Sequence, residues 1–251
     1  MRLTGFDGAS AFVTGAAGGI GWAVVQALTD AGARVMATDM AVPDEGGAVW
    51  RVLDVRDRPR ADALLAEAAA LHGPVTLAVH AAGVLATGPL LQMTPDEWQR
   101  ISQINAGGTL NVLSALGRVM VPQRRGAIVV VGSNAGGVPR LGIGAYGATK
   151  AAAAMLTRCA GLELAPRGIR CNLIAPGSTL TPMQTGMWAD PSAGAAAVIG
   201  GDVACFRAGI PLGKLATPED IANAAMFLLS DQAGHVTMAD LYVDGGATLR
   251  A

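Results

Sequence analysis

The strongest constraint on the fold is an alternation that runs along all 251 residues. Short apolar runs rich in β-branched residues alternate with longer segments of helical pattern, which predicts repeated βαβ units around a parallel sheet. The predicted strands lie near residues 10–14, 34–39, 48–54, 75–80, 127–132, 169–174 and 240–243. The predicted helices lie at 19–31, 58–71, 95–121, 146–165 and 218–230.

The composition favours one α/β domain spanning residues 1–251. With 51% hydrophobic and 15% charged residues, the chain can bury a large core. Its 34 glycines favour tight turns and close contacts between helices and sheet. The net charge is −1 and the basic residues are scattered, which argues against nucleic acid or a membrane surface as a partner.

We expect a soluble, cytoplasmic protein without a metal site. Residues 8–29 carry no charge and could span a bilayer, but five glycines within them fit a strand, a turn and a helix better. The cysteines form no C-x-x-C pair, which favours a reducing compartment, and the histidines lack the usual spacing of metal ligands. These residues are Cys159, Cys171, Cys205, His72, His80 and His235.

The alternation is interrupted between residues 176 and 211, which are rich in Gly, Ala, Met and Pro. Long irregular segments in compact domains are usually lids or disordered stretches. Apolar side chains here would be costly to leave in water. We therefore interpret residues 178–210 as a substrate lid; its apolar residues include Met183, Met187, Trp188, Ile199 and Phe206.

A glycine-rich turn between the first predicted strand and helix predicts a dinucleotide site. Such glycines let the backbone approach a pyrophosphate, whose charge then lies at the helix N-terminus. Asp39 ends the next strand, eighteen residues after Gly21, as this motif requires. A tight turn without a ligand is the alternative. We predict a doubly wound parallel sheet of Rossmann type, with cofactor contacts from Gly15, Gly18, Gly19, Ile20 and Gly21.

Asp39 favours NAD over NADP. Its carboxylate can accept hydrogen bonds from ribose hydroxyls and would repel a 2′-phosphate. No basic residue lies in the glycine turn or directly after Asp39 to bind such a phosphate. Asp54, followed by Val55, is a candidate adenine contact, although an aspartate at the end of a strand is as often a helix cap.

Tyr146 and Lys150 are four residues apart in a predicted helix and therefore share a face. A tyrosine with a pKa of about 10 is a poor base unless a cation is near, and we expect Lys150 to lower that pKa. Ser133 follows an apolar strand, where its hydroxyl could hold a substrate oxygen. Asn105, in the helix predicted at 95–121, is assigned to a polar network reaching Lys150. Each residue alone also has an ordinary structural interpretation.

Together these motifs resemble the short-chain dehydrogenase/reductases over essentially the whole chain. The resemblance implies a catalytic group of Ser133, Tyr146, Lys150 and Asn105, and usually a homotetramer formed through helices near 107–121 and 146–164. It also implies cofactor contacts from Ala81, Ala82, Gly83, Tyr146, Lys150, Pro176, Gly177 and Thr179. One departure concerns the end of the fourth strand, where His80 begins His-Ala-Ala-Gly and the family commonly has Asn-Asn-Ala-Gly.

A narrower resemblance concerns residues 138–142, 183–184, 209–214 and 243–249. These segments resemble dehydrogenases that act on 2,3-dihydro-2,3-dihydroxybenzoate or 2,3-dihydro-3-hydroxyanthranilate in siderophore or antibiotic pathways. The resemblance implies NAD-dependent oxidation of the C3 ring alcohol of a cyclohexadiene carboxylate, followed by aromatisation. The sequence leaves open whether C2 carries a hydroxyl or an amino group.

Arg140 is the main candidate for the substrate carboxylate, because an arginine can bind a carboxylate through two hydrogen bonds. A solvated surface arginine is its alternative. The remaining substrate candidates are Gly142, Met183, Gln184 and Arg207. Two other functions stay open: a reductase of 3-oxoacyl thioesters or other ketones, which would favour NADP, and a non-catalytic dinucleotide-binding protein.

Overall fold

In the computed structural model, which describes residues 2–43, 47–188, 190 and 192–249, seven parallel strands form one sheet. The strand order is β3-β2-β1-β4-β5-β6-β7, so the chain winds outward in both directions from β1 and β4. This is the doubly wound α/β fold that the sequence predicts. The strands are β1 (Ser10–Thr14), β2 (Arg34–Asp39), β3 (Val49–Val52), β4 (Val75–His80), β5 (Gly126–Val131), β6 (Ile169–Pro176) and β7 (Asp240–Val243).

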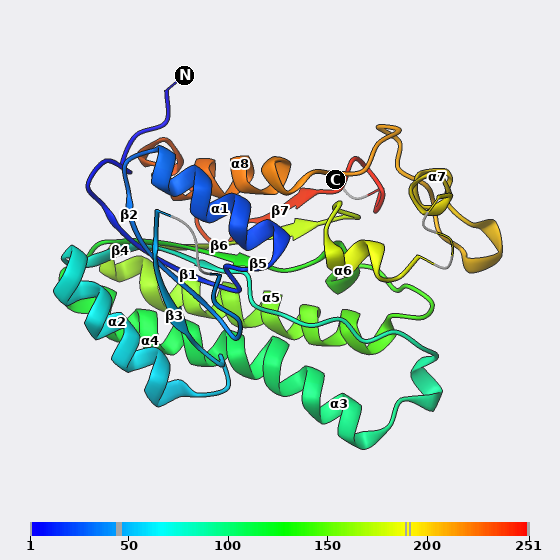
Figure 1. Cartoon of the computed structure of the whole chain (residues 1–251), viewed down its shortest axis with the longest axis horizontal. Helices are drawn as coiled ribbons and strands as arrows, with labels where there is room; N and C mark the ends of the chain where they lie inside the picture. The colour runs from blue at the N-terminus through cyan, green and yellow to red at the C-terminus, as the bar shows by residue number, and fades with distance from the viewer. Residues whose placement is uncertain (1, 44–46, 189, 191, 250–251) are drawn as a thin grey trace.

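Helices cover both faces of the sheet (Figure 1). Helices α1 and α8 pack side by side on one face, and α2, α4 and α5 cover the other. The helices are α1 (Gly19–Asp30), α2 (Arg58–His72), α3 (Pro95–Ser102), α4 (Gly108–Gln123), α5 (Gly144–Leu164), α6 (Pro182–Thr185), α7 (Gly194–Gly200) and α8 (Pro218–Leu229). Short 3-10 turns occupy Leu90–Gln92, Asn134–Gly136, Ala165–Arg167, Val203–Cys205 and Asp231–Ala233.

The central strands are apolar because helices bury both of their faces. All six residues of β5 are buried, and β1 is buried throughout. One core cluster joins Val13 to Leu28 of α1, and the other joins Phe12 to Leu116 of α4. Neighbouring residues of a strand therefore belong to different cores, as the alternation of side chains across a strand requires.

The single helix predicted at 95–121 is wrong in detail, because a π-helical turn at Gln103–Gly107 separates α3 from α4. The extra residue of a π-helical turn interrupts the regular hydrogen bonding, and such turns are frequent at functional sites. The side chain of Asn105, inside this turn, bonds the backbone of Val84. Elsewhere the ends shift slightly: β3 is shorter than predicted, and α5 begins at Gly144.

The irregular region predicted after residue 176 contains two short helices, α6 and α7, and the turn Val203–Cys205. These pieces lie at one end of the sheet, on the right in Figure 1, beyond β6. The backbone N–H of Leu180 bonds the carbonyl of Ala216, which ties the start of this region to the segment that follows it.

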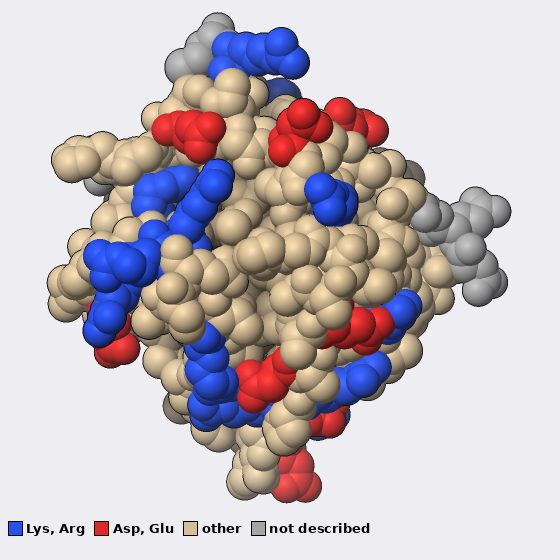
Figure 2. All heavy atoms as spheres, turned by 90° about the vertical axis from the view of Figure 1, so that its left-hand side faces the viewer, with Lys and Arg blue, Asp and Glu red and all other residues tan. Residues whose placement is uncertain are grey.

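Figure 2 shows the face of the molecule opposite α6 and α7. Basic and acidic side chains are interspersed there among uncharged residues. Within the described part of the chain, no helix combines the length and apolar character needed to cross a membrane.

Candidate active site

The glycine turn after β1 is held in a shape that only glycine adopts easily. Gly15 has φ +67°, and a Cβ there would lie 2.4 Å from the backbone nitrogen of Ala82. A Cβ on Gly21 would lie 2.0 Å from the carbonyl oxygen of Gly15. Both positions therefore require a bare backbone, which brings the turn against residues 81–82 after β4.

This turn suits a dinucleotide, because α1 begins in it without a side-chain cap. Gly18 is the N-cap of α1 and has no side chain to cap the first turn, which leaves N–H groups there to bind an anion. Asp39, at the end of β2, accepts hydrogen bonds from the backbone N–H groups of Ala17 (3.0 Å) and Met40 (2.7 Å). The glycine turn and Asp39, the two parts of the predicted motif, thus contact each other at one edge of the sheet.

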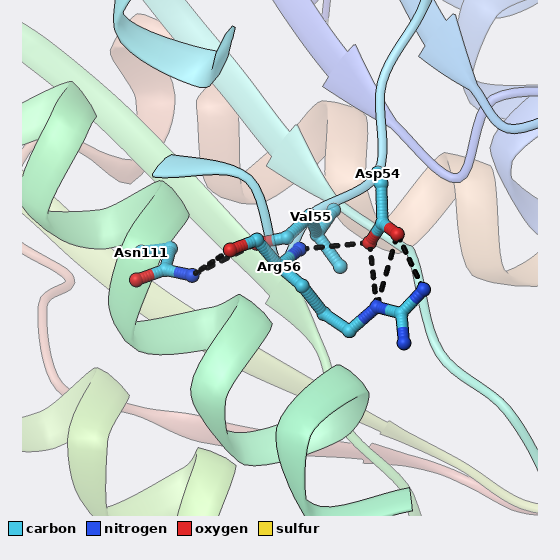
Figure 3. Close-up of polar contacts among 4 residues, drawn as sticks. All are labelled: Asp54, Val55, Arg56 and Asn111. Atoms are coloured by element: carbon cyan, nitrogen blue, oxygen red, sulfur yellow. Dashed lines mark hydrogen bonds and ion pairs between the residues drawn. The ribbon is translucent and has the colours of Figure 1, made fainter. Parts of the chain in front are cut away.

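Asp54 and Val55, the predicted adenine contacts, follow β3 in a polar cluster shown in Figure 3. Arg56 donates from Nε and Nη2 to the Asp54 carboxylate, with a shortest distance of 2.6 Å. This bond to Arg56 holds the pKa of Asp54 below its usual value. Asn111 donates to the carbonyl of Val55 at 3.0 Å. The strand end is therefore fixed by the chain's own residues, and adenine contacts there stay a prediction.

Ser133, Tyr146 and Lys150 converge at the carboxyl end of β5. Ser133 lies two residues beyond β5 and accepts from the backbone N–H of Ala135 at 3.2 Å. Tyr146 and Lys150 lie in the first two turns of α5, with Lys150 Nζ 5.8 Å from the centre of the Tyr146 ring. Lys150 is buried and donates to the carbonyl of Val131 at 3.0 Å.

The titration of Tyr146 differs from the sequence-based expectation. Burial raises the pKa of Tyr146, and a hydrogen bond with Ser133 acts in the opposite direction. Burial also lowers the pKa of Lys150 to about 8. Desolvation of the phenol therefore outweighs the hydrogen bond with Ser133, and the pKa of Tyr146 is raised on balance.

Asn105 is buried near Lys150, and a polar network that joins the two stays a prediction. Its side chain accepts from the Val84 N–H at 2.8 Å and donates to the Val84 carbonyl and to Thr149 Oγ1, each at 2.9 Å. A Cβ on Gly83 would lie 3.1 Å from Lys150 Nζ and 3.2 Å from Asn105 Oδ1. The segment that follows β4 therefore passes close to both polar groups at Gly83.

A cavity of about 630 Å³ joins these groups to the substrate candidates. Ser133, Tyr146 and Lys150 line it together with Ile20, Ala81, Gly83, Pro176, Gly177 and Thr179. Arg140, Gly142, Met183, Gln184 and Arg207, all predicted to contact substrate, line it as well. Asn105, Asp39, Asp54, Val55, Ala82 and the four glycines of the turn lie outside its lining.

Arg140 and Arg207 bring two positive charges to this cavity. Burial lowers the pKa of Arg140, the charge of Arg207 lowers it further, and Asp244 opposes both. To the residues that the structure describes, Arg140 donates a single long bond, 3.4 Å, to the carbonyl of Ala247. The Nε of Arg207 is buried without a partner among the described residues. Asp202, also in the lining, uses its carboxylate to cap the turn at Val203–Cys205.

The sequence prediction missed the contribution of the C-terminal segment. Ala247 lines the cavity, and the buried Asp244 accepts from the N–H and hydroxyl of Thr248. Asn134 donates to the same carboxylate at 3.3 Å, which links the loop after Ser133 to the end of the chain. The Asp-Gly-Gly at 244–246 was the available signal, since two glycines at positive φ mark a tight turn.

Comparisons with known proteins identify the family of this chain. A family model described as "Enoyl-(Acyl carrier protein) reductase" matches residues 15–248. A 2,3-dihydro-2,3-dihydroxybenzoate dehydrogenase of Bacillus subtilis is 45% identical, with 99% of each chain covered. The enzyme of the same name from Escherichia coli is 42% identical, covering 98% of this chain and 99% of the relative.

A solved structure agrees with the fold. Aldohexose dehydrogenase of Thermoplasma acidophilum, in ligand-free form, superposes with a TM-score of 0.89 at 26% identity. The alignment covers 100% of this chain and 98% of that one. With the family model, the near full-length relatives and the cavity that joins serine, tyrosine and lysine, the chain belongs to the short-chain dehydrogenase/reductase family of oxidoreductases, which use a nicotinamide dinucleotide.

Proposed function

We propose that the protein oxidises the C3 ring alcohol of a cyclohexadiene carboxylate with NAD, and that the product tautomerises to an aromatic acid. The observation that carries the proposal is the pair of arginines in the cavity that also contains Ser133, Tyr146 and Lys150. The residues suited to alcohol oxidation and the arginines suited to binding an anion thus line the same cavity. The two relatives named above act, by their names, on 2,3-dihydro-2,3-dihydroxybenzoate, which has both functional groups.

In the proposed reaction Tyr146 Oη takes the proton of the C3 hydroxyl while Ser133 Oγ holds the same oxygen. A nicotinamide dinucleotide held at the glycine turn would supply the acceptor for the hydride that leaves C3. Because burial raises the pKa of Tyr146, the phenolate needs a nearby positive charge when it forms. The ammonium of Lys150 supplies that charge in the cavity, where the carbonyl of Val131 accepts its hydrogen bond.

Arg140 and Arg207 bind the carboxylate in this proposal. The positive charge of Arg207 lowers the pKa of Arg140, and an anion bound between the two guanidinium groups would offset this repulsion. Within the described part of the chain, no carboxylate lies within 4 Å of either guanidinium. Met183 and Gln184 of α6 contact the ring in the same arrangement, and residues 178–210 close over it as a lid.

NAD is the proposed cofactor because Asp39 faces the glycine turn at the place where the adenosine ribose binds in this fold. Its carboxylate would repel a 2′-phosphate.

A homotetramer is proposed from the exposed apolar side chains on α4 and α5: Leu110, Met155 and Leu162. The free thiols of Cys159, Cys171 and Cys205 support a reducing, cytoplasmic location. Light scattering during gel filtration measures the oligomeric state.

The function is tested by incubating the protein with NAD and each dihydroaromatic acid, 2-hydroxy and 2-amino, while following NADH absorbance and product fluorescence. The proposal expects both signals to rise together with at least one acid. Faster reduction of a 3-oxoacyl thioester by NADPH would favour the ketone-reductase function instead.

A further inference from the structure

A buried chain of hydrogen bonds crosses the sheet behind the candidate active site. His80, the last residue of β4, contacts Thr14 Oγ1 through Nδ1 at 2.7 Å and Thr109 Oγ1 through Nε2 at 3.1 Å. Thr109, on α4, donates its hydroxyl to the carbonyl of Asn105 at 2.6 Å. All four residues are essentially inaccessible to solvent.

The donor and acceptor of each hydrogen bond in this series can be assigned by starting from the Asn105 carbonyl. The carbonyl of Asn105 can only accept, so Thr109 must donate to it. Thr109 Oγ1 then accepts from His80, which places the imidazole proton on Nε2. The bare Nδ1 therefore accepts from the hydroxyl of Thr14. The imidazole is neutral because burial lowers its pKa to about 3, so once Nε2 carries the proton, Nδ1 is left as an acceptor.

The two ends of the chain belong to different parts of the site. Thr14 directly precedes Gly15, whose turn approaches the backbone of residues 81–82. Asn105 lies in the π-helical turn and, with Lys150, faces Gly83. His80 is thus the one side chain among those described that bonds both the strand leading into the glycine turn and the helix that carries Asn105.

We propose that His80 is a positioning residue with two separable effects, one on the cofactor turn through Thr14 and one on the Asn105–Lys150 pair through Thr109. The inference rests on the proposed dehydrogenase function for its turnover measurements. Asparagine at position 80 could reach Thr14, but it is too short to reach Thr109 as well. Glutamine extends about as far as the imidazole Nε2.

The first test compares variants of the two threonines. Thr109→Val keeps the side-chain volume and removes the hydroxyl; we expect kcat to fall about tenfold while the Kd for NAD changes less than twofold. Thr109→Ser keeps a hydroxyl and should recover most of kcat. Thr14→Val should show the opposite split, with a Kd for NAD raised about tenfold and a smaller change in kcat, and Thr14→Ser should recover NAD binding.

The second test links these effects to His80. His80→Asn should reproduce the Thr109→Val phenotype, His80→Gln should be milder, and the double variant His80→Asn with Thr109→Val should be no slower than either single variant. Equal values of kcat and Kd in all variants, with only lower melting temperatures, would show that the chain is purely structural. A double variant whose loss of kcat equals the product of the losses in the two single variants would also overturn the proposal.

A third measurement does not depend on turnover. Nitrogen-15 NMR of the wild-type protein should show a neutral His80 with the proton on Nε2. A proton on Nδ1 would reverse the chain and overturn the proposal. If the wild type oxidised neither acid, the dehydrogenase function would fail while the NMR result and the NAD affinities of the Thr14 variants still decided the role of His80.

Discussion

Asp39 Oδ2 lies 3.0 Å from the backbone nitrogen of Ala17, so the carboxylate at the end of β2 binds the glycine turn directly. The same side chain bonds the N–H of Met40 through Oδ1. Asp39 therefore has two roles in the proposed cofactor site: it orders the turn, and it sets the charge where the ribose would bind.

Substitutions of Asp39 should separate these roles. Asp39→Asn keeps an oxygen acceptor and removes the charge, so we expect a smaller preference for NAD over NADP with modest loss of NAD affinity. Asp39→Ala also frees the turn and should weaken NAD binding by about ten- to a hundredfold. Calorimetric titration of both cofactors checks this. A wild type that already binds NADP more tightly would contradict the assignment.

Tyr146→Phe should abolish turnover and leave NAD affinity nearly intact, because the hydroxyl acts on the substrate proton. Loss of a general acid–base group costs roughly a hundredfold to ten-thousandfold in rate. Steady-state kinetics with parallel NAD titration measures both quantities. Retention of more than a tenth of kcat would remove Tyr146 from its proposed role.

Arg140→Leu and Arg207→Leu should each raise KM for the carboxylate substrate and spare NAD binding. A charge-assisted hydrogen bond contributes about 1.5–3 kcal/mol, or roughly ten- to a hundredfold in kcat/KM. Arg167→Leu, an exposed arginine in the turn after α5, is the matched control. A neutral cyclohexenol should be insensitive to all three changes. Equal losses with the acid and the neutral alcohol would mean that the arginines support loops.

His80 should make stability depend on pH. Burial, with the charge of Lys150, lowers its pKa to about 3 from an ordinary value of 6.5. Between these values the unfolded chain binds a proton that the folded chain does not, so stability is present above pH 6.5 and falls as the pH is lowered. The slope from this group is about 1.4 kcal/mol per pH unit. Urea unfolding between pH 4 and 6 should show a shallower slope in His80→Gln; identical slopes would mean that His80 titrates normally.

The sequence predicted most of the sheet, because β5 and its neighbours are buried on both faces and read as continuous apolar runs. The sequence also predicted that Ser133, Tyr146 and Lys150 lie close together, because the carboxyl ends of parallel strands meet at one edge of the sheet. The π-helical turn at Asn105 was missed; the Asn105 side chain in it bonds Val84, 21 residues earlier, a contact that helical periodicity does not reveal. The closeness of Arg140 and Arg207 could not be predicted from sequence periodicity, because it depends on the tertiary structure of the region that contains Arg207.

The fate of a deuterium at C3 tests the central claim most directly. A cyclohexadiene carboxylate labelled at C3 is incubated with NAD and the wild-type protein, and the reduced cofactor and the aromatic acid are analysed by mass spectrometry and NMR. The account predicts that the deuterium is transferred to the nicotinamide ring and is absent from the aromatic product. Reduced cofactor without deuterium, or an aromatic acid that keeps it at C3, would contradict oxidation at the C3 alcohol.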